Sequence, residues 1–191
     1  MHRRPIVSIC RASRAYKRAG FLVGWLTRLL GRSDDGALLP LYDAVVAEGR
    51  APHWYVEGRV PDSVDGRFDM IAAVLSVVLL RLEAEPAGTA ASVRLTERFV
   101  DDMDGQLRQI GIGDITVGKH MGQMMSMLGG RLGAYRAGLA AGDLAPALAR
   151  NLYRGDPPAD DAMRHVADGL TALKGRLGTL PLDTVIAGRL A

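Results

Sequence analysis

The 191-residue chain contains a single cysteine, Cys10, and only 5% aromatic residues. One cysteine cannot form a disulfide within the chain, so the composition does not point to an oxidising compartment. The longest apolar run, residues 70–80, is shorter than the roughly 18 to 20 residues that a membrane-spanning helix needs. We therefore expect a protein of the cytoplasm or of another reducing compartment, without a spanning helix.

The sequence also lacks the motifs of common catalytic mechanisms. It has no Gly-x-Ser-x-Gly turn, no phosphate-binding loop and no glycine-rich turn from strand to helix. The four histidines are scattered, and no two have the spacing of metal ligands on a helix. We interpret the methionines that follow His120 as core residues of an amphipathic helix rather than as ligands of a soft metal or haem. We expect no metal site, no cofactor and no nucleophilic catalysis.

Acidic residues cluster at Asp101, Asp102 and Asp104. Helical prenyl-diphosphate enzymes hold magnesium with aspartate pairs, but Gly105 stands where a further aspartate would be needed, and the chain has no second cluster of matching form. A solvated acidic helix face is therefore the favoured interpretation. The alternative is a helical enzyme that acts on a prenyl or lipid diphosphate through Asp101, Asp102 and magnesium.

Residues 1–33 carry eight cationic side chains and no acidic one, whereas the whole chain has a formal charge of +3, so the remainder carries −5. This basic N-terminal arm, in which we predict an amphipathic helix, permits three interpretations: a solvated leader, an electrostatic contact with anionic lipid or ribosomal RNA, or a transit peptide. The candidate residues for membrane or ribosome contact are Arg11, Arg14, Lys17, Arg18, Phe21, Trp25 and Arg28.

Helical periodicity dominates the rest of the chain, and no convincing alternating strand interrupts it. We predict an all-α fold, with a single compact domain of about six to eight helices over residues 34–191. Residues 38–48 form a helix closed by Gly49, residues 68–83 form the central core helix, and residues 92–111 and 114–141 pair as an antiparallel hairpin. Three shorter helical patterns follow: one after Asp143, one around residues 163–177 and one from Thr179 onward.

Several unusual sequence blocks occur in a fixed order. They are VPDSVDGRFDM at 60–70, FVDDMD at 99–104, LRQIGIGD at 107–114, VGK at 117–119, GRLGAY at 130–135 and RNLY at 150–153. Together they resemble the core of the ubiquinol–cytochrome c chaperone family over about residues 40–155. Leu128 and Gly129 stand where an aromatic pair is usual, and we match nothing in residues 156–191.

The resemblance implies a non-enzymatic assembly chaperone for newly made cytochrome b, the haem-bearing membrane subunit of the cytochrome bc1 complex of the respiratory chain. Implied partners are nascent cytochrome b, a small partner protein and the ribosome, with no DNA. The chain contains far more arginine than lysine, which is typical of proteins from GC-rich genomes. This favours a bacterial member of the family, located at the cytoplasmic face of the inner membrane. A eukaryotic member would lie on the mitochondrial matrix side. The remaining alternative is a peripheral scaffold that binds anionic lipid through the arm and has no specific client.

Charged residues and methionines of the family-like core are the candidate client contacts. Cations and carboxylates offer complementary charge, and methionine side chains repack around varied sequences. Arg67 and Arg131 also permit a structural interpretation, as ion pairs with Asp62, Asp65, Asp69 or Asp101. The predicted client-binding residues are Arg67, Asp101, Asp102, Asp104, Arg108, Asp114, Lys119, Met121, Met124, Met125, Arg131 and Tyr135.

Overall fold

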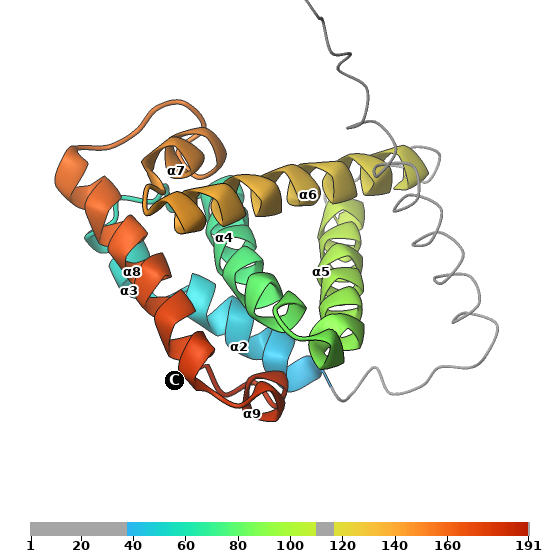
Figure 1. Ribbon diagram of the computed structural model, residues 1–191. Helices are drawn as coiled ribbons and strands as arrows, with labels where there is room; N and C mark the ends of the chain where they lie inside the picture. The colour runs from blue at the N-terminus through green and yellow to red at the C-terminus, as the bar shows by residue number, and fades with distance from the viewer. Residues whose placement is uncertain (1–37, 110–116, 191) are drawn as a thin grey trace, which may run out of the picture. The chain divides into compact units, whose positions relative to one another are not determined.

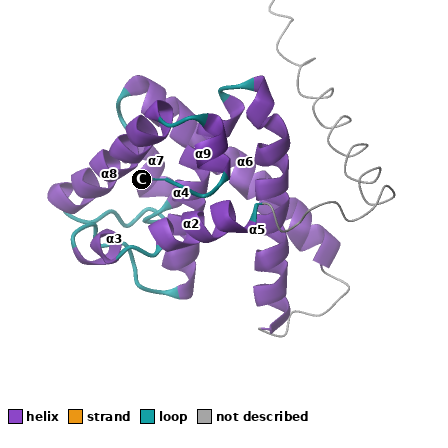
Figure 2. Cartoon of the chain, turned by 90° about the horizontal axis from the view of Figure 1, so that it is seen from below, coloured by secondary structure: helices purple, strands orange, loops and turns teal. Residues whose placement is uncertain are grey.

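The computed structural model in Figure 1 describes the backbone of residues 38–109 and 117–190 and the side chains of residues 38–102 and 128–190. All regular elements in this part are helical (Figure 2), which confirms the all-α prediction. The basic arm and the turn around Asp114 lie outside the described residues. The elements are α2 (Leu39–Gly49), α3 (Pro52–Val56), α4 (Val64–Glu83), the 3-10 helix η1 (Pro86–Gly88), α5 (Thr89–Gln109), α6 (Val117–Ala141), α7 (Ala145–Asn151), α8 (Asp160–Thr179) and α9 (Leu182–Ile186).

Helix α4 forms the centre of the described domain. Its first turn is capped by Ser63, whose Oγ accepts a hydrogen bond of 3.1 Å from the backbone N–H of Gly66. All side chains from Asp69 to Leu79 are buried, because α2, α5, α6 and α8 pack around the helix. This arrangement confirms the predicted core helix.

Helix α2 ends directly against α4. A Cβ atom at Gly49 would lie 2.9 Å from the Cα of Ile71, so this position needs a glycine for the close approach. Between α2 and α4 the structure contains the short helix α3, which we did not predict from the sequence. Pro52 starts α3, and the buried Trp54 anchors it by donating from Nε1 to the carbonyl oxygen of Glu48 at 2.8 Å.

Helices α5 and α6 do not form the predicted antiparallel hairpin. Helix α6 lies mainly against α4, and Figure 1 shows it crossing α5 rather than running beside it. Leu128 and Tyr135 of α6 are buried in the common core. Helical periodicity identifies the apolar face of a helix but not its packing partner, and α4 offers an apolar surface on all sides.

Helix α8 packs its apolar face on α4 and confirms the pattern predicted around residues 163–177. Val166, Leu170, Leu173 and Leu177 are completely buried. At the end of α8, Arg81 of α4 donates from Nε to the Leu177 carbonyl at 2.8 Å and from Nη2 to the Leu180 carbonyl at 3.0 Å. These bonds satisfy carbonyl groups that a helix end leaves free. Among the described residues, no helix combines the length and apolar character needed to cross a bilayer.

Candidate functional site

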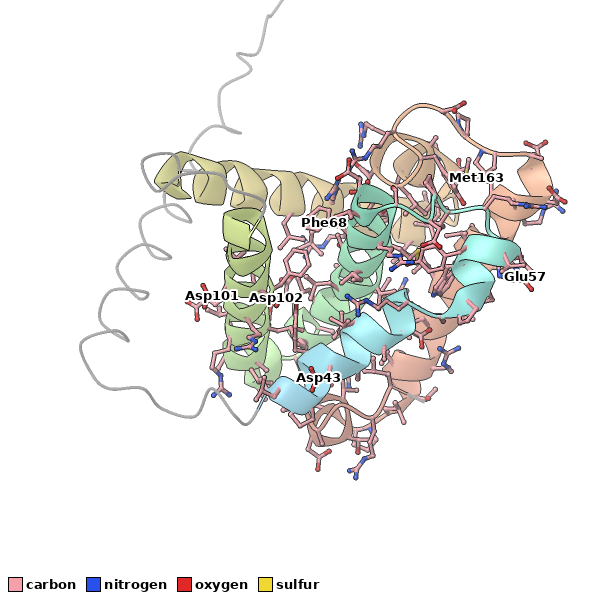
Figure 3. The ribbon with its side chains drawn as sticks, turned by 180° about the vertical axis from the view of Figure 1, so that it is seen from behind. Asp43, Glu57, Phe68, Asp101, Asp102 and Met163 are labelled. Carbon is pink, nitrogen blue, oxygen red and sulfur yellow. The ribbon has the colours of Figure 1, made fainter. Side chains whose placement is uncertain are left out.

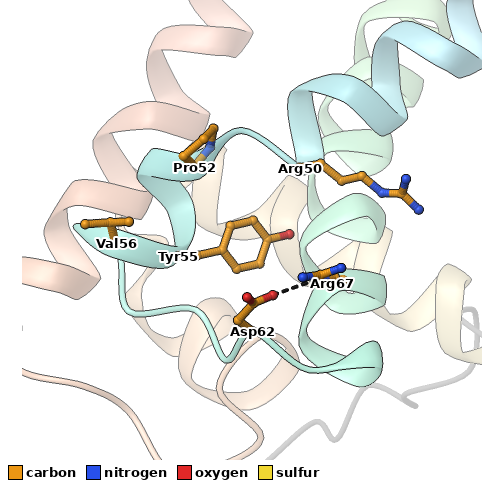
Figure 4. A pocket seen from close by; sticks show the side chains of 6 residues that line it. All are labelled: Arg50, Pro52, Tyr55, Val56, Asp62 and Arg67. Carbon is orange, nitrogen blue, oxygen red and sulfur yellow. Dashed lines mark hydrogen bonds and ion pairs between the residues drawn. The ribbon is translucent and has the colours of Figure 1, made fainter.

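Two neighbouring hollows lie where α2, α3, α4 and α5 meet. The first has a volume of about 340 Å³ (Figure 4), and the second has a volume of about 170 Å³. Both are lined by Arg50 and Arg67, and we call the two hollows with their rims the Arg50–Arg67 surface. The other lining residues are Pro52, Tyr55, Val56 and Asp62 in the first hollow, and Tyr42, Val46, Val64, Phe68, Ile71 and Asp102 in the second.

The two arginines differ in their partners. The Nε of Arg67 lies 2.6 Å from Oδ1 of Asp62 in an exposed ion pair, and this hydrogen bond lowers the pKa of the Asp62 carboxyl. Arg50 is exposed at the C-terminal end of α2, and no carboxylate among the described residues pairs with it. A cation at this end of a helix interacts favourably with the helix dipole. On this surface the guanidinium of Arg67 is therefore held in an ion pair, whereas that of Arg50 is in no ion pair with a described carboxylate.

Tyr55 joins the first hollow to the end of α2. Its hydroxyl donates a hydrogen bond of 2.7 Å to the carbonyl oxygen of Gly49, which is the residue before Arg50. Burial raises the pKa of this hydroxyl, so it remains a donor at neutral pH. Figure 4 shows the ring between α3 and the side chain of Arg67. The hydrogen bond holds α3 and the cationic end of α2 together.

Asp102 closes the second hollow on the α5 side. It accepts a hydrogen bond of 2.7 Å from the hydroxyl of Tyr42, whose pKa is raised by burial and by this bond. Figure 3 shows Asp102 on the side of α5 that faces α2 and α4, whereas Asp101 points away from them. The two adjacent carboxylates therefore face different surroundings and do not form a chelating pair. The described residues contain no group of three or more histidine, cysteine or acidic side chains placed to hold a metal ion.

Phe68 gives the second hollow an aromatic wall. Its ring stacks on Phe99 of α5 with a centroid distance of 5.6 Å. The guanidinium carbon of Arg131, from α6, lies 5.2 Å from the Phe68 centroid, which is a cation–π distance. Phe68 is therefore fixed from the interior by two other helices.

Behind this wall lies an ion-pair network centred on the buried Asp69. Nη2 of Arg131 lies 2.5 Å from Oδ1, and Nε of Arg154 lies 2.7 Å from Oδ2. Arg154 also pairs with Asp65 at 2.7 Å. Burial raises the pKa of Asp69, while the hydrogen bond from Arg154 and the charge of Arg131 act in the opposite direction. Two blocks of the family-like pattern, 60–70 and 130–135, thus meet at one carboxylate together with Arg154, the residue directly after the block 150–153.

Tyr135 belongs to the interior beside this network. The side chain is completely buried, and its hydroxyl has no hydrogen-bond partner among the described residues. Burial raises its pKa, so the hydroxyl is protonated. Nearby, the Tyr153 hydroxyl donates a hydrogen bond of 2.6 Å to the carbonyl oxygen of Gly58, which ties the end of α7 to the segment after α3. Both tyrosines are buried and therefore contribute to the packing of the domain, not to a binding surface.

Two histidines that are far apart in the sequence meet between α3 and α8. Nδ1 of His53 lies 3.0 Å from Nε2 of His165. Burial lowers the pKa of His53, and the charge of His165 adds to this effect. At this distance one ring donates and the other accepts, which requires at least one neutral imidazole.

The structure separates the predicted client-binding residues into three groups. Arg67 and Asp102 line the same hollow, and Asp101 is exposed on the outer side of α5. Arg131 and Tyr135 are interior, and Arg131 forms one of the ion pairs that we predicted as an alternative role. The others have no described side chain: Asp104, Arg108, Asp114, Lys119, Met121, Met124 and Met125. The arm candidates Arg11, Arg14, Lys17, Arg18, Phe21, Trp25 and Arg28 also lie outside the described residues.

Sequence reasoning missed several residues of this site. Arg50, Tyr42 and Tyr55 belong to helices other than α4, and no spacing rule connects them with Arg67. The helix end signalled by Gly49 was the available indication that Arg50 lies at a corner. The pairing of His53 with His165 had no sequence signal, because 112 positions separate them.

Comparisons with known proteins agree with this architecture. The family model described as ubiquinol-cytochrome C chaperone matches residues 56–191, and so includes the C-terminal part that we had not matched. The crystal structure of the Cbp3 homolog from Brucella abortus superposes with a TM-score of 0.72 at 30% sequence identity, covering 87% of this chain and 93% of that one. No curated protein matches the sequence. The chain belongs to the ubiquinol-cytochrome c chaperone family.

Proposed function

We propose that this protein is a non-enzymatic chaperone that holds newly made cytochrome b and supports assembly of the cytochrome bc1 complex. Family membership supports the assembly role, and a fold shared with the Brucella abortus protein over most of both chains is consistent with it. The Arg50–Arg67 surface is our candidate for the client contact. Its helices pack around one shared hydrophobic core, which suits a surface that must keep its shape.

The observation that carries this proposal is the exposure of apolar side chains at the Arg50–Arg67 surface. Val56 on the rim of the first hollow is 60% exposed, and Val64 on the rim of the second is 71% exposed. Apolar residues that gather beside charged ones are typical of interaction sites. A membrane-protein client offers apolar segments that need cover before insertion, and this surface supplies apolar contacts with charged residues that keep it soluble.

The test removes apolar contact without touching the core. The Val64→Asp variant places a charge on the rim of the second hollow, so we expect less cytochrome b to co-purify with the tagged protein from native membranes. Val93→Asp is the matched control, because Val93 is 47% exposed on α5 and lines neither hollow. Equal loss from both variants, with both folded, would remove the Arg50–Arg67 surface from the proposal.

Deleting the gene tests whether cytochrome b is the client, in cells grown under conditions that require the bc1 complex. We expect lower b-type haem absorbance in membranes, with the cytochrome b messenger and unrelated haem proteins unchanged. Charge reversal at Arg108 or Lys119, which we retain as proposed contacts, should reproduce part of the loss in a protein with normal thermal unfolding. Normal cytochrome b in the deletion strain would contradict the chaperone role.

A further inference from the structure

We infer that the Arg50–Arg67 surface selects client segments in which a carboxylate side chain is flanked by apolar residues, and that Arg50 binds this carboxylate. This inference rests on the proposed function and adds the chemistry of the segment recognised. The occupant is a polypeptide segment, because apolar side chains must fill the hollows on both sides of the cation.

The position of Arg50 is the first step. It is the C-cap residue directly after α2, and its backbone N–H donates to the carbonyl oxygens of Val46 and Ala47 at 3.1 and 3.2 Å. The neighbouring Gly49 is held by the Tyr55 hydroxyl at 2.7 Å and by its contact with α4. The backbone that carries this guanidinium is therefore fixed from two sides, which reduces the entropy lost on binding.

Charge is the second step. The first hollow contains two guanidinium groups, Arg50 and Arg67, but one carboxylate, Asp62, which is already bonded to Arg67 at 2.6 Å. In the second hollow Asp102 accepts the Tyr42 hydroxyl on the α5 side. Arg50 lies on the wall shared by both hollows, and although Asp102 lines the second hollow with it, Arg50 forms no ion pair with a carboxylate of the described residues. Arginine presents its donors in a planar fork that matches a carboxylate.

The surroundings of Arg50 are the third step. Val56 and Tyr55 line the hollow on one side, and Val64 and Phe68 line the hollow on the other. When a partner covers these side chains, water leaves the surface and the attraction between guanidinium and carboxylate becomes stronger. A purely apolar segment would instead cover Arg50 without a partner, which is unfavourable. The surface therefore distinguishes an acidic side chain from its amide.

Overlapping peptides from the cytochrome b encoded in the same genome provide the probe. Retention of the full-length protein is measured on each peptide and on a copy in which Glu or Asp is replaced by Gln or Asn. We expect the retained peptides to contain a carboxylate between apolar residues, and the amide copies to bind roughly tenfold more weakly, as expected for losing a charged hydrogen bond. The Arg50→Gln variant should bind acid and amide copies equally.

Arg164→Gln is the matched control, because Arg164 is exposed on α8 and lines neither hollow. This variant should discriminate between acid and amide as the unchanged protein does. Equal binding of acid and amide copies by the unchanged protein overturns the inference and leaves the proposed function standing. Discrimination that survives in Arg50→Gln also overturns it. If no cytochrome b peptide is retained at all, the proposed function fails and the inference with it.

Anionic phosphatidylglycerol vesicles test the competing class of partner in the same assay. We expect Arg50→Gln and Arg164→Gln to bind these vesicles equally. A selective loss in Arg50→Gln, together with unchanged peptide discrimination, would overturn the inference and assign Arg50 to lipid. Circular dichroism and urea unfolding of both variants verify that neither change alters the fold.

Discussion

Nη2 of Arg131 lies 2.5 Å from Oδ1 of Asp69, and this interior ion pair joins α6 to α4. The Asp69 side chain has no exposed surface, and that of Arg131 is 12% exposed. The same guanidinium lies 5.2 Å from the ring centroid of Phe68, which lines the second hollow. One buried pair therefore supports both the packing of α6 and one wall of the Arg50–Arg67 surface.

Removing the carboxylate of Asp69 should strongly destabilise the fold. The Asp69→Asn variant leaves Arg131 inside the domain without its counter-charge, and we expect the free energy of unfolding to fall by about 3 to 5 kcal/mol. Urea denaturation measures this loss. The control is Arg136→Gln, which breaks a more exposed pair with Glu83 and should cost less than about 1 kcal/mol. A similar loss in both variants would contradict a special role for the buried pair.

The packing of Trp54 against α8 leads to opposite effects of two similar substitutions. A Cβ at Gly169 would lie 2.5 Å from the ring of the buried Trp54, so Gly169→Ala should lower the free energy of unfolding by roughly 1 to 3 kcal/mol. Gly175 lies on the same helix with nothing within 4 Å of such a Cβ. Gly175→Ala should therefore raise stability by roughly 0.5 to 1 kcal/mol through helix propensity. Thermal and urea unfolding should both show the difference in sign.

The pair of His53 and His165 should make stability depend on pH. Because the pKa of His53 in the folded state is lowered below its ordinary value of about 6.5, the unfolded chain binds more protons near that pH. The stabilisation is present above about pH 6.5 and is lost as the pH falls through the folded pKa. Glu48 and Glu57 raise the pKa of His53, whereas Arg176 lowers it, so all three face this site.

Urea unfolding between pH 7.5 and 5.5 measures this dependence. We expect the free energy of unfolding to fall with acidification, and the slope to be smaller in His53→Gln, which keeps a polar side chain but cannot titrate. A slope unchanged by this substitution would assign the pH dependence to other groups.

The basic arm, residues 1–33, should provide electrostatic attachment. Removing it should leave residues 34–191 folded, because the helices of residues 38–190 pack around a large hydrophobic core of their own. Affinity for anionic vesicles or for ribosomes should fall, and attachment of the full chain should weaken with salt, since exposed charges are screened over about 8 to 10 Å near physiological ionic strength. Sedimentation with each partner separately distinguishes lipid from ribosome. Unchanged binding to both would contradict this prediction.

The sequence by itself determined the helical class and the faces of the main helices. The apolar residues of α8 repeat at helical spacing, and the residues of α4 are apolar on all sides, so both elements were predicted with their burial. These signals are local, because a helix forms its backbone hydrogen bonds within a few residues. The ordered blocks also pointed to the chaperone family, which the family comparison confirmed.

The tertiary structure alone decided which of these faces meet and which charges are paired. Arg131 and Arg154 lie 62 and 85 positions from Asp69, and Tyr42 lies 60 positions from Asp102, yet each pair is in hydrogen-bond contact. Periodicity predicted α5 and α6 but not the packing of α6 on α4. Contacts of this kind depend on how buried surfaces fit one another in space, and the spacing of residues along one helix carries no information about a partner on another. The Arg50–Arg67 surface therefore exists only once the helices have packed.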